Sequence, residues 1–89
     1  MKKRKPSEVT VEEFFNLCLD AETIREESYD GEKYTKKYYD IAEEVCIKNK
    51  LTNDFIGPIS GIIFALWNDV QVWSKVLGIK HEAIGNKDK

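Results

Sequence analysis

The chain has 89 residues, of which 42% are hydrophobic and 34% are charged, and its formal net charge is −2. This length allows one domain with one core, and the composition excludes a wholly disordered chain and a collagen-like repeat. The longest apolar run, residues 55–67, is shorter than the roughly 20 residues of a membrane span and contains glycine, proline and serine. Because acidic residues follow the basic start, no export signal is predicted, and the chain is expected to be cytoplasmic.

Charge is distributed unevenly along the chain. Residues 2–5 are all basic, whereas residues 8–32 contain nine acidic residues and the single base Arg25, a net charge of −8. We expect a flexible basic arm at residues 1–7, a single helical domain at 8–79 and a flexible polar tail at 80–89.

The first helix is predicted from Thr10 to Ser28. Thr10 followed by Glu13 matches a capping box, in which each residue satisfies a backbone amide of the other. An apolar stripe follows at helical spacing. The opposite side is acidic, with Glu13, Asp20 and Glu27 seven residues apart.

A turn at Asp30-Gly31 precedes a second helix, predicted from Glu32 to Lys48. Tyr29 and Tyr39 are expected outside the core, where tyrosine is a candidate anchor for a partner. The face that we expect to be buried contains Tyr34, Tyr38, Ile41, Ala42 and Val45.

A third helix is predicted from Pro58 to Leu77, with Gly78 as its C-terminal stop. Its first half is apolar almost all round, so this helix either is central or dimerises. Phe64, Trp67 and Val72 extend its apolar surface and are the candidate self-association residues. The predicted core stripe consists of Ile59, Ile62, Ile63, Leu66, Val70, Trp73 and Leu77.

These three segments predict an all-α fold, a small bundle of three main helices with room for a fourth short helical turn near residues 52–56. Asp69 is unusual because the predicted third helix places it within the apolar arc. A charge there needs either a partner, such as a lysine of the second helix, or a route to water.

The sequence offers no pattern typical of catalysis. The only histidine, His81, lies in the polar tail, and no phosphate-binding, zinc or di-iron motif occurs. Cys18 and Cys46 are 28 residues apart and are expected to be buried, reduced thiols, with a disulfide as the alternative. We therefore expect a non-enzymatic protein without a metal or cofactor.

Two functional hypotheses remain open. In the first, Glu13, Asp20, Glu27, Tyr29 and Tyr39 bind another protein with a basic surface. An ordinary solvated helix face is the simpler interpretation of the same carboxylates. In the second, the Lys2 to Lys5 arm contacts phosphates and the chain is a small nucleic-acid-associated regulator.

Overall fold

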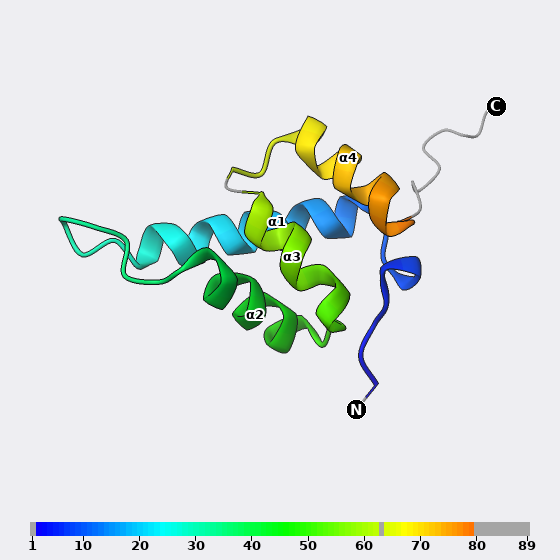
Figure 1. Ribbon diagram of the computed structural model, residues 1–89, viewed down its shortest axis with the longest axis horizontal. Helices are drawn as coiled ribbons and strands as arrows, with labels where there is room; N and C mark the ends of the chain where they lie inside the picture. Colours follow the sequence, from blue (N-terminus) through cyan, green and yellow to red (C-terminus); the bar gives the residue numbers. More distant parts are fainter. Residues whose placement is uncertain (1, 63, 80–89) are drawn as a thin grey trace.

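The computed structural model describes residues 2–62 and 64–79. Within these residues the chain is all-α and contains no strand, which confirms the predicted fold class (Figure 1). No helix in this part of the chain is long and apolar enough to cross a membrane. The α-helices are α1 (Val11–Glu27), α2 (Tyr38–Asn49), α3 (Ile56–Gly61) and α4 (Trp67–Leu77), and the short 3₁₀ helices are η1 (Pro6–Glu8) and η2 (Asn53–Phe55).

Helix α1 forms where the capping signals predict it. The Glu13 amide donates to Thr10 Oγ1 over 3.1 Å, and Glu13 Oε1 accepts from the Thr10 amide over 3.0 Å. At the other end the Ser28 amide donates to the carbonyls of Ile24 and Arg25. Both ends are therefore satisfied by groups close in sequence.

Helix α2 begins six residues later than predicted, at Tyr38. The Asp30 carboxylate accepts the amides of Glu32 and Lys33, and Thr35 donates both its amide and its hydroxyl to the Ser28 carbonyl. These bonds fold residues 29–37 back as a loop, because the Thr35 amide, which a helix beginning at Glu32 would direct to the Gly31 carbonyl, is used by Ser28 instead.

The predicted burial of two tyrosines is also wrong. Tyr34 lies in this loop and is 40% exposed, and Tyr38 at the start of α2 is 41% exposed. The rest of that predicted face is correct, since Ile41, Ala42 and Val45 are buried.

The predicted third helix is divided in two. α3 ends at Gly61, Ile62 turns to an extended conformation (φ −100°, ψ 94°), and α4 begins only at Trp67. The short turn predicted before it is present as η2. Gly78 ends α4 in the left-handed conformation, with φ 77°, as expected.

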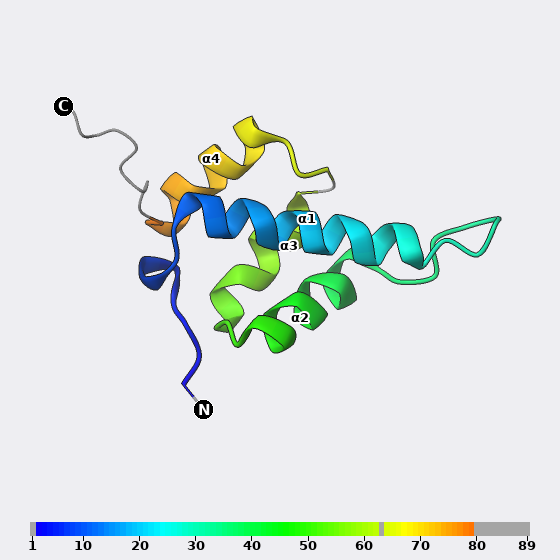
Figure 2. The same ribbon diagram turned by 180° about the vertical axis from the view of Figure 1, so that it is seen from behind.

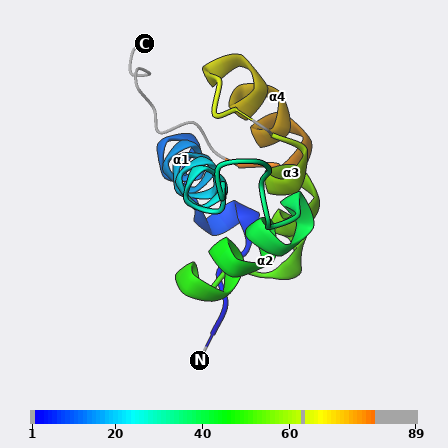
Figure 3. The same cartoon turned by 90° about the vertical axis from the view of Figure 1, so that its left-hand side faces the viewer.

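The break follows Gly61, the last residue of α3, and residues 62–66 contain neither proline nor glycine, so packing also favours a break here. α3 packs on α2, whereas α4 packs on α1, so two short helices cover surfaces that one straight helix would not reach. Viewed along α1, the helices α2, α3 and α4 form an arc on one side of it (Figure 3).

The break changes the predicted core stripe. Ile59, Ile62 and Val70 are buried, and Trp73 and Leu77 are half-buried against the core. Leu66, which was expected in the core, is 57% exposed because it lies in the connection between the two helices. Ile63 and the tail, residues 80–89 with His81, lie outside the described residues.

The core lies between α1 and this arc of helices. Its largest members, Phe14 and Phe55, are fully buried, with ring centroids 6.1 Å apart. Seen from behind, α1 crosses in front of α3, with α4 and α2 on its two long sides (Figure 2). One side of α1 therefore supports the core, and the other faces solvent.

Part of the predicted basic arm contacts the domain. The Arg4 amide donates to the Lys50 carbonyl over 2.8 Å, and the Arg4 carbonyl accepts from the Thr52 amide over 3.0 Å. Pro6 and Val9, which follow, are buried. This segment lies at the end of the molecule opposite the 29–37 loop (Figure 1).

Candidate protein-binding surface

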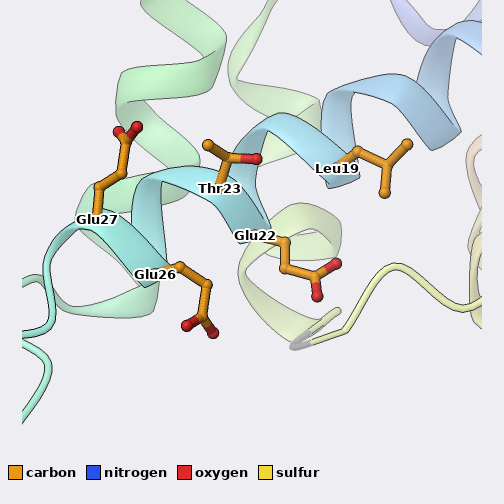
Figure 4. A pocket seen from close by; sticks show the side chains of 5 residues that line it. All are labelled: Leu19, Glu22, Thr23, Glu26 and Glu27. Atoms are coloured by element: carbon orange, nitrogen blue, oxygen red, sulfur yellow. The ribbon is translucent and has the colours of Figure 1, made fainter.

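The C-terminal half of α1 carries a shallow hollow on its solvent side (Figure 4). Leu19, which is 39% exposed, supplies an apolar patch in this hollow. Three carboxylates follow Leu19 along α1 toward its C-terminal end. The hollow has a volume of about 470 Å³ and is lined by Leu19, Glu22, Thr23, Glu26 and Glu27.

Contacts with neighbouring groups orient two of these carboxylates. Glu22 Oε1 accepts the Ala65 amide from the α3–α4 connection over 3.4 Å. Glu26 Oε2 lies 3.3 Å from a guanidinium nitrogen of Arg25. Glu22 and Glu26 point to one side of the helix, whereas Glu27 points to the other (Figure 4). The carboxylates therefore lie on both sides of the hollow.

Aromatic rings gather around Arg25 just beyond this hollow. Its guanidinium carbon lies 3.9 Å from the ring centroid of Tyr34, 5.6 Å from that of Tyr38 and 5.8 Å from that of Phe64. Tyr29 packs on Tyr34, with centroids 4.9 Å apart. We call these four rings and Arg25 the aromatic corner. It holds a guanidinium against π faces, an attractive arrangement.

The backbone of the loop fixes the aromatic corner. Tyr29 and Tyr34 form an antiparallel bridge, and Asp30 closes the turn between them by accepting two amides. These backbone hydrogen bonds, from Lys33 first and then from Glu32, lower the pKa of Asp30 below its ordinary value. The ionised carboxylate is thus the form that holds the loop.

The structure separates the five residues predicted to bind a partner. Glu27 lines the hollow of Leu19, and Tyr29 belongs to the adjoining aromatic corner. Tyr39 lies near the start of α2 and is 58% exposed. Glu13 and Asp20 instead share a different hollow, of about 180 Å³, which also includes Arg4.

Glu13 is already engaged within the chain. Its carboxylate accepts the Thr10 amide and lies 3.2 Å from the Arg4 guanidinium. The Thr10 amide, followed by Arg4, lowers the pKa of Glu13. A partner would have to compete with Arg4 for this carboxylate.

Sequence reasoning missed the residues that surround Glu27 in the hollow. Glu22 and Glu26 belong to the acidic block, and Leu19 lies at the edge of the apolar stripe. The spacing of residues 19, 22, 23 and 26 (i, i+3, i+4, i+7) was the available signal, because four such side chains on a helix form a hole that receives a side chain of another helix.

The three residues predicted to self-associate do not form one face. Phe64 joins the aromatic corner, and Trp67 contacts Phe15 of α1 edge-on, with ring centroids 5.5 Å apart. Val72 is 61% exposed on the outer side of α4.

The two cysteines are free and buried. Burial raises the pKa of Cys18 to about 12. The pKa of Cys46 is raised to about 11, and burial is the largest of its causes. Both thiols are therefore protonated at neutral pH and are poor nucleophiles. Within residues 2–62 and 64–79, no three His, Cys, Asp or Glu side chains are grouped so as to hold a metal ion.

No known protein family matches the chain, and neither a curated protein nor a solved structure is similar to it. The chemistry of its own surfaces is therefore the basis for a functional proposal.

Proposed function

We propose that the chain is a non-enzymatic protein-binding module that takes a partner with a basic surface. The binding site is the hollow on α1 together with the aromatic corner. The observation that supports this proposal is the exposed Leu19 at one end of a hollow that three carboxylates line. An apolar contact at Leu19 excludes water, and the neighbouring charges of one sign attract a cationic partner.

The aromatic corner adds a second kind of contact. Tyr29 and Tyr34 are 48% and 40% exposed, and exposed tyrosines provide large contact areas at little cost in conformational entropy. The Tyr34 ring already accepts the Arg25 guanidinium within the chain, and Tyr29 packs on Tyr34. Arginine or lysine side chains of a partner are therefore suited to the outer faces of these rings and to the neighbouring carboxylates.

The alternative is a nucleic-acid-associated regulator that uses the Lys2 to Lys5 arm. Lys2, Lys3 and Lys5 are exposed and can meet phosphates, but Arg4 is paired with Glu13. The carboxylates of α1 would also repel a nucleic acid. These charges favour the protein-binding proposal.

The test is an affinity capture from the native host with nuclease treatment, followed by mass spectrometry. The immobilised chain is compared with a Glu26→Lys/Glu27→Lys variant, which reverses two of the carboxylates that line the hollow. We expect a basic protein that resists nuclease, elutes with added salt and is lost with the variant, because screening and charge reversal both remove the attraction.

An Asp40→Lys/Glu43→Lys variant is the matched control. It changes the net charge by the same amount on exposed positions of α2, away from the hollow. Loss of the captured protein with this control as well would reject a site on α1. Recovery of nuclease-sensitive material that depends on residues 2–5 would support the alternative.

A further inference from the structure

The outer side of α4 is an exposed helix face that no other described element covers. Val72 and Val76 are 61% and 68% exposed on it. Asn68, Asp69 and Lys75 on the same face are exposed too. The opposite side of the helix, with Val70 and Ser74, is buried against the domain. α4 therefore packs one face against the core and leaves a second, partly apolar face exposed.

The charges on this face are arranged symmetrically about Val72. Asp69 lies three residues before Val72, and Lys75 lies three residues after it. At about 100° per residue, both side chains lie about 60° from Val72, on opposite sides of it. Reversing the direction of the helix about Val72 thus exchanges the positions of a negative and a positive charge.

We propose that this face binds a second copy of the chain, with the two α4 helices antiparallel across a two-fold axis at Val72. Val72 then meets Val72 of the other copy on the axis. Asp69 of each copy lies level with Lys75 of the other, within reach of the long lysine side chain, so two intermolecular ion pairs form. A two-fold interface requires a surface that is complementary to itself, and this distribution of charge satisfies that condition.

The same face also carries a hollow beside Val72. A hollow of about 270 Å³ is lined by Asn68, Gln71, Val72 and Lys75, again the i, i+3, i+4, i+7 set that receives a side chain from a facing helix. The hollow lies on the Lys75 side of Val72, and Val72 forms one of its edges, so a side chain of a facing copy can enter it beside Val72.

A parallel pairing does not fit the same charges. It would bring the two copies of Asp69 together, and likewise the two copies of Lys75, and like charges at an interface are unfavourable. The antiparallel pairing also gives Asp69 a partner. The sequence suggested a lysine of the second helix, whereas in the structure Asp69 is exposed on a different helix face.

The dimer is expected to be weak. α4 has 11 residues and is therefore about 16 Å long. Two helices of this length bury less than the roughly 1,200 Å² of a standard stable interface, so we expect a dissociation constant on the order of 0.1–1 mM. Self-association should thus respond to local concentration.

Sedimentation equilibrium of the full chain over this concentration range tests the proposal with two variants. Asp69→Lys and Lys75→Asp each place like charges at both ion-pair positions, and each should weaken dimerisation by about tenfold or more. An equimolar mixture of the two variants recreates both ion pairs across the interface. The mixture should therefore dimerise as well as the original chain.

Recovery in the mixture cannot come from better folding, because mixing changes no chain. Asp40→Lys is the matched control, since Asp40 is exposed and lies in the first turn of α2, as Asp69 does in α4. This variant should dimerise like the original chain. The proposal is overturned if the original chain stays monomeric, if the mixture does not recover, or if Asp40→Lys dissociates equally.

Discussion

The solvent faces of α1 and α4 are similar in architecture but differ in the signs of the charges that they carry. Each face contains an exposed aliphatic residue, Leu19 on α1 and Val72 on α4. The charges around Leu19 are three carboxylates, whereas those around Val72 are one Asp and one Lys, placed symmetrically. Two copies of the α1 face repel each other, but two antiparallel copies of the α4 face attract.

Under the two proposals, this difference in charge decides which partner each face accepts. An apolar centre favours contact with almost any apolar surface, so the surrounding charges decide which partner is accepted. On α1 they favour a different protein with a basic surface. On α4 they favour a second copy, which would bring two α1 faces into one assembly and raise avidity for a repetitive partner.

The largest expected effect comes from the core that supports both faces. Phe14 is fully buried against Phe55, and Phe14→Ala should lower the free energy of unfolding by about 3–5 kcal/mol. The free energy of unfolding of domains of this size is only about 5–15 kcal/mol, so the fold, and with it both faces, should be lost together. Urea unfolding followed by circular dichroism measures the change.

Leu19→Ala is the control for that experiment. This residue is exposed, so the free energy of unfolding should change by less than about 0.5 kcal/mol while the apolar centre of the α1 face is lost. If Phe14→Ala left one of the two faces able to bind, the faces would not depend on the same core.

A smaller effect on stability should be confined to α4 and so distinguish the two faces. Phe15→Ala removes the edge-on contact with Trp67. The ring pair alone is worth about 0.5–1.5 kcal/mol, and lost burial adds to this. Hydrogen exchange should accelerate in α4, which rests on this contact, much more than in α1. Phe15→Leu, which keeps apolar volume, should give a milder change. Equal acceleration in both helices would contradict this separation.

A substitution at the start of α1 tests the stability of that helix. Thr10→Ala removes the hydroxyl that accepts the Glu13 amide and should cost about 1 kcal/mol in unfolding free energy. Thr10→Ser retains that acceptor and should cost much less. Thermal unfolding of the two variants gives the comparison, and equal losses would show that the cap contributes little.

Acidification should have the smallest effect, and it acts through Glu13 in α1 and Asp30 in the loop that follows α1. Backbone amides lower the pKa values of Glu13 and Asp30 below their ordinary values of 4.5 and 3.8. The unfolded chain therefore takes up protons first, so this stabilisation is complete above those values and is lost as the pH falls through the lower folded pKa values.

Urea midpoints measured across this pH range check the acid effect. Glu13→Gln cannot ionise and should lose less stability on acidification than the original chain. A Glu13→Gln variant with the same acid sensitivity would exclude Glu13 as a contributor.

Much of the fold could be predicted because its signals are local. The capping box of Thr10 and Glu13 lies within four residues, and Gly78 ends α4 because a left-handed residue is needed there. The loop before α2 was missed although its signals are also polar and nearby. The Asp30 bonds are local and are equally compatible with a helix start, whereas the bond from Thr35 to Ser28 forms only when the chain folds back.

The candidate site was predicted less completely than the fold. Glu27 and Tyr29 were identified from charge and residue type, and both lie in the proposed site. The role of Arg25 was missed, because its guanidinium meets Tyr34 only after the loop turns and Phe64 only after the α3–α4 connection folds over α1.

The sequence by itself determined the helical class, the bounds of α1 and the sign of charge on its outer face, since these follow from caps, periodicity and composition. Only the tertiary structure decided the break between Gly61 and Trp67. A continuous helix satisfies every backbone group locally, but its all-round apolar surface finds cover on too few sides. Breaking it lets α3 pack on α2 and α4 on α1, and the Glu22 carboxylate accepts the Ala65 amide that the break exposes.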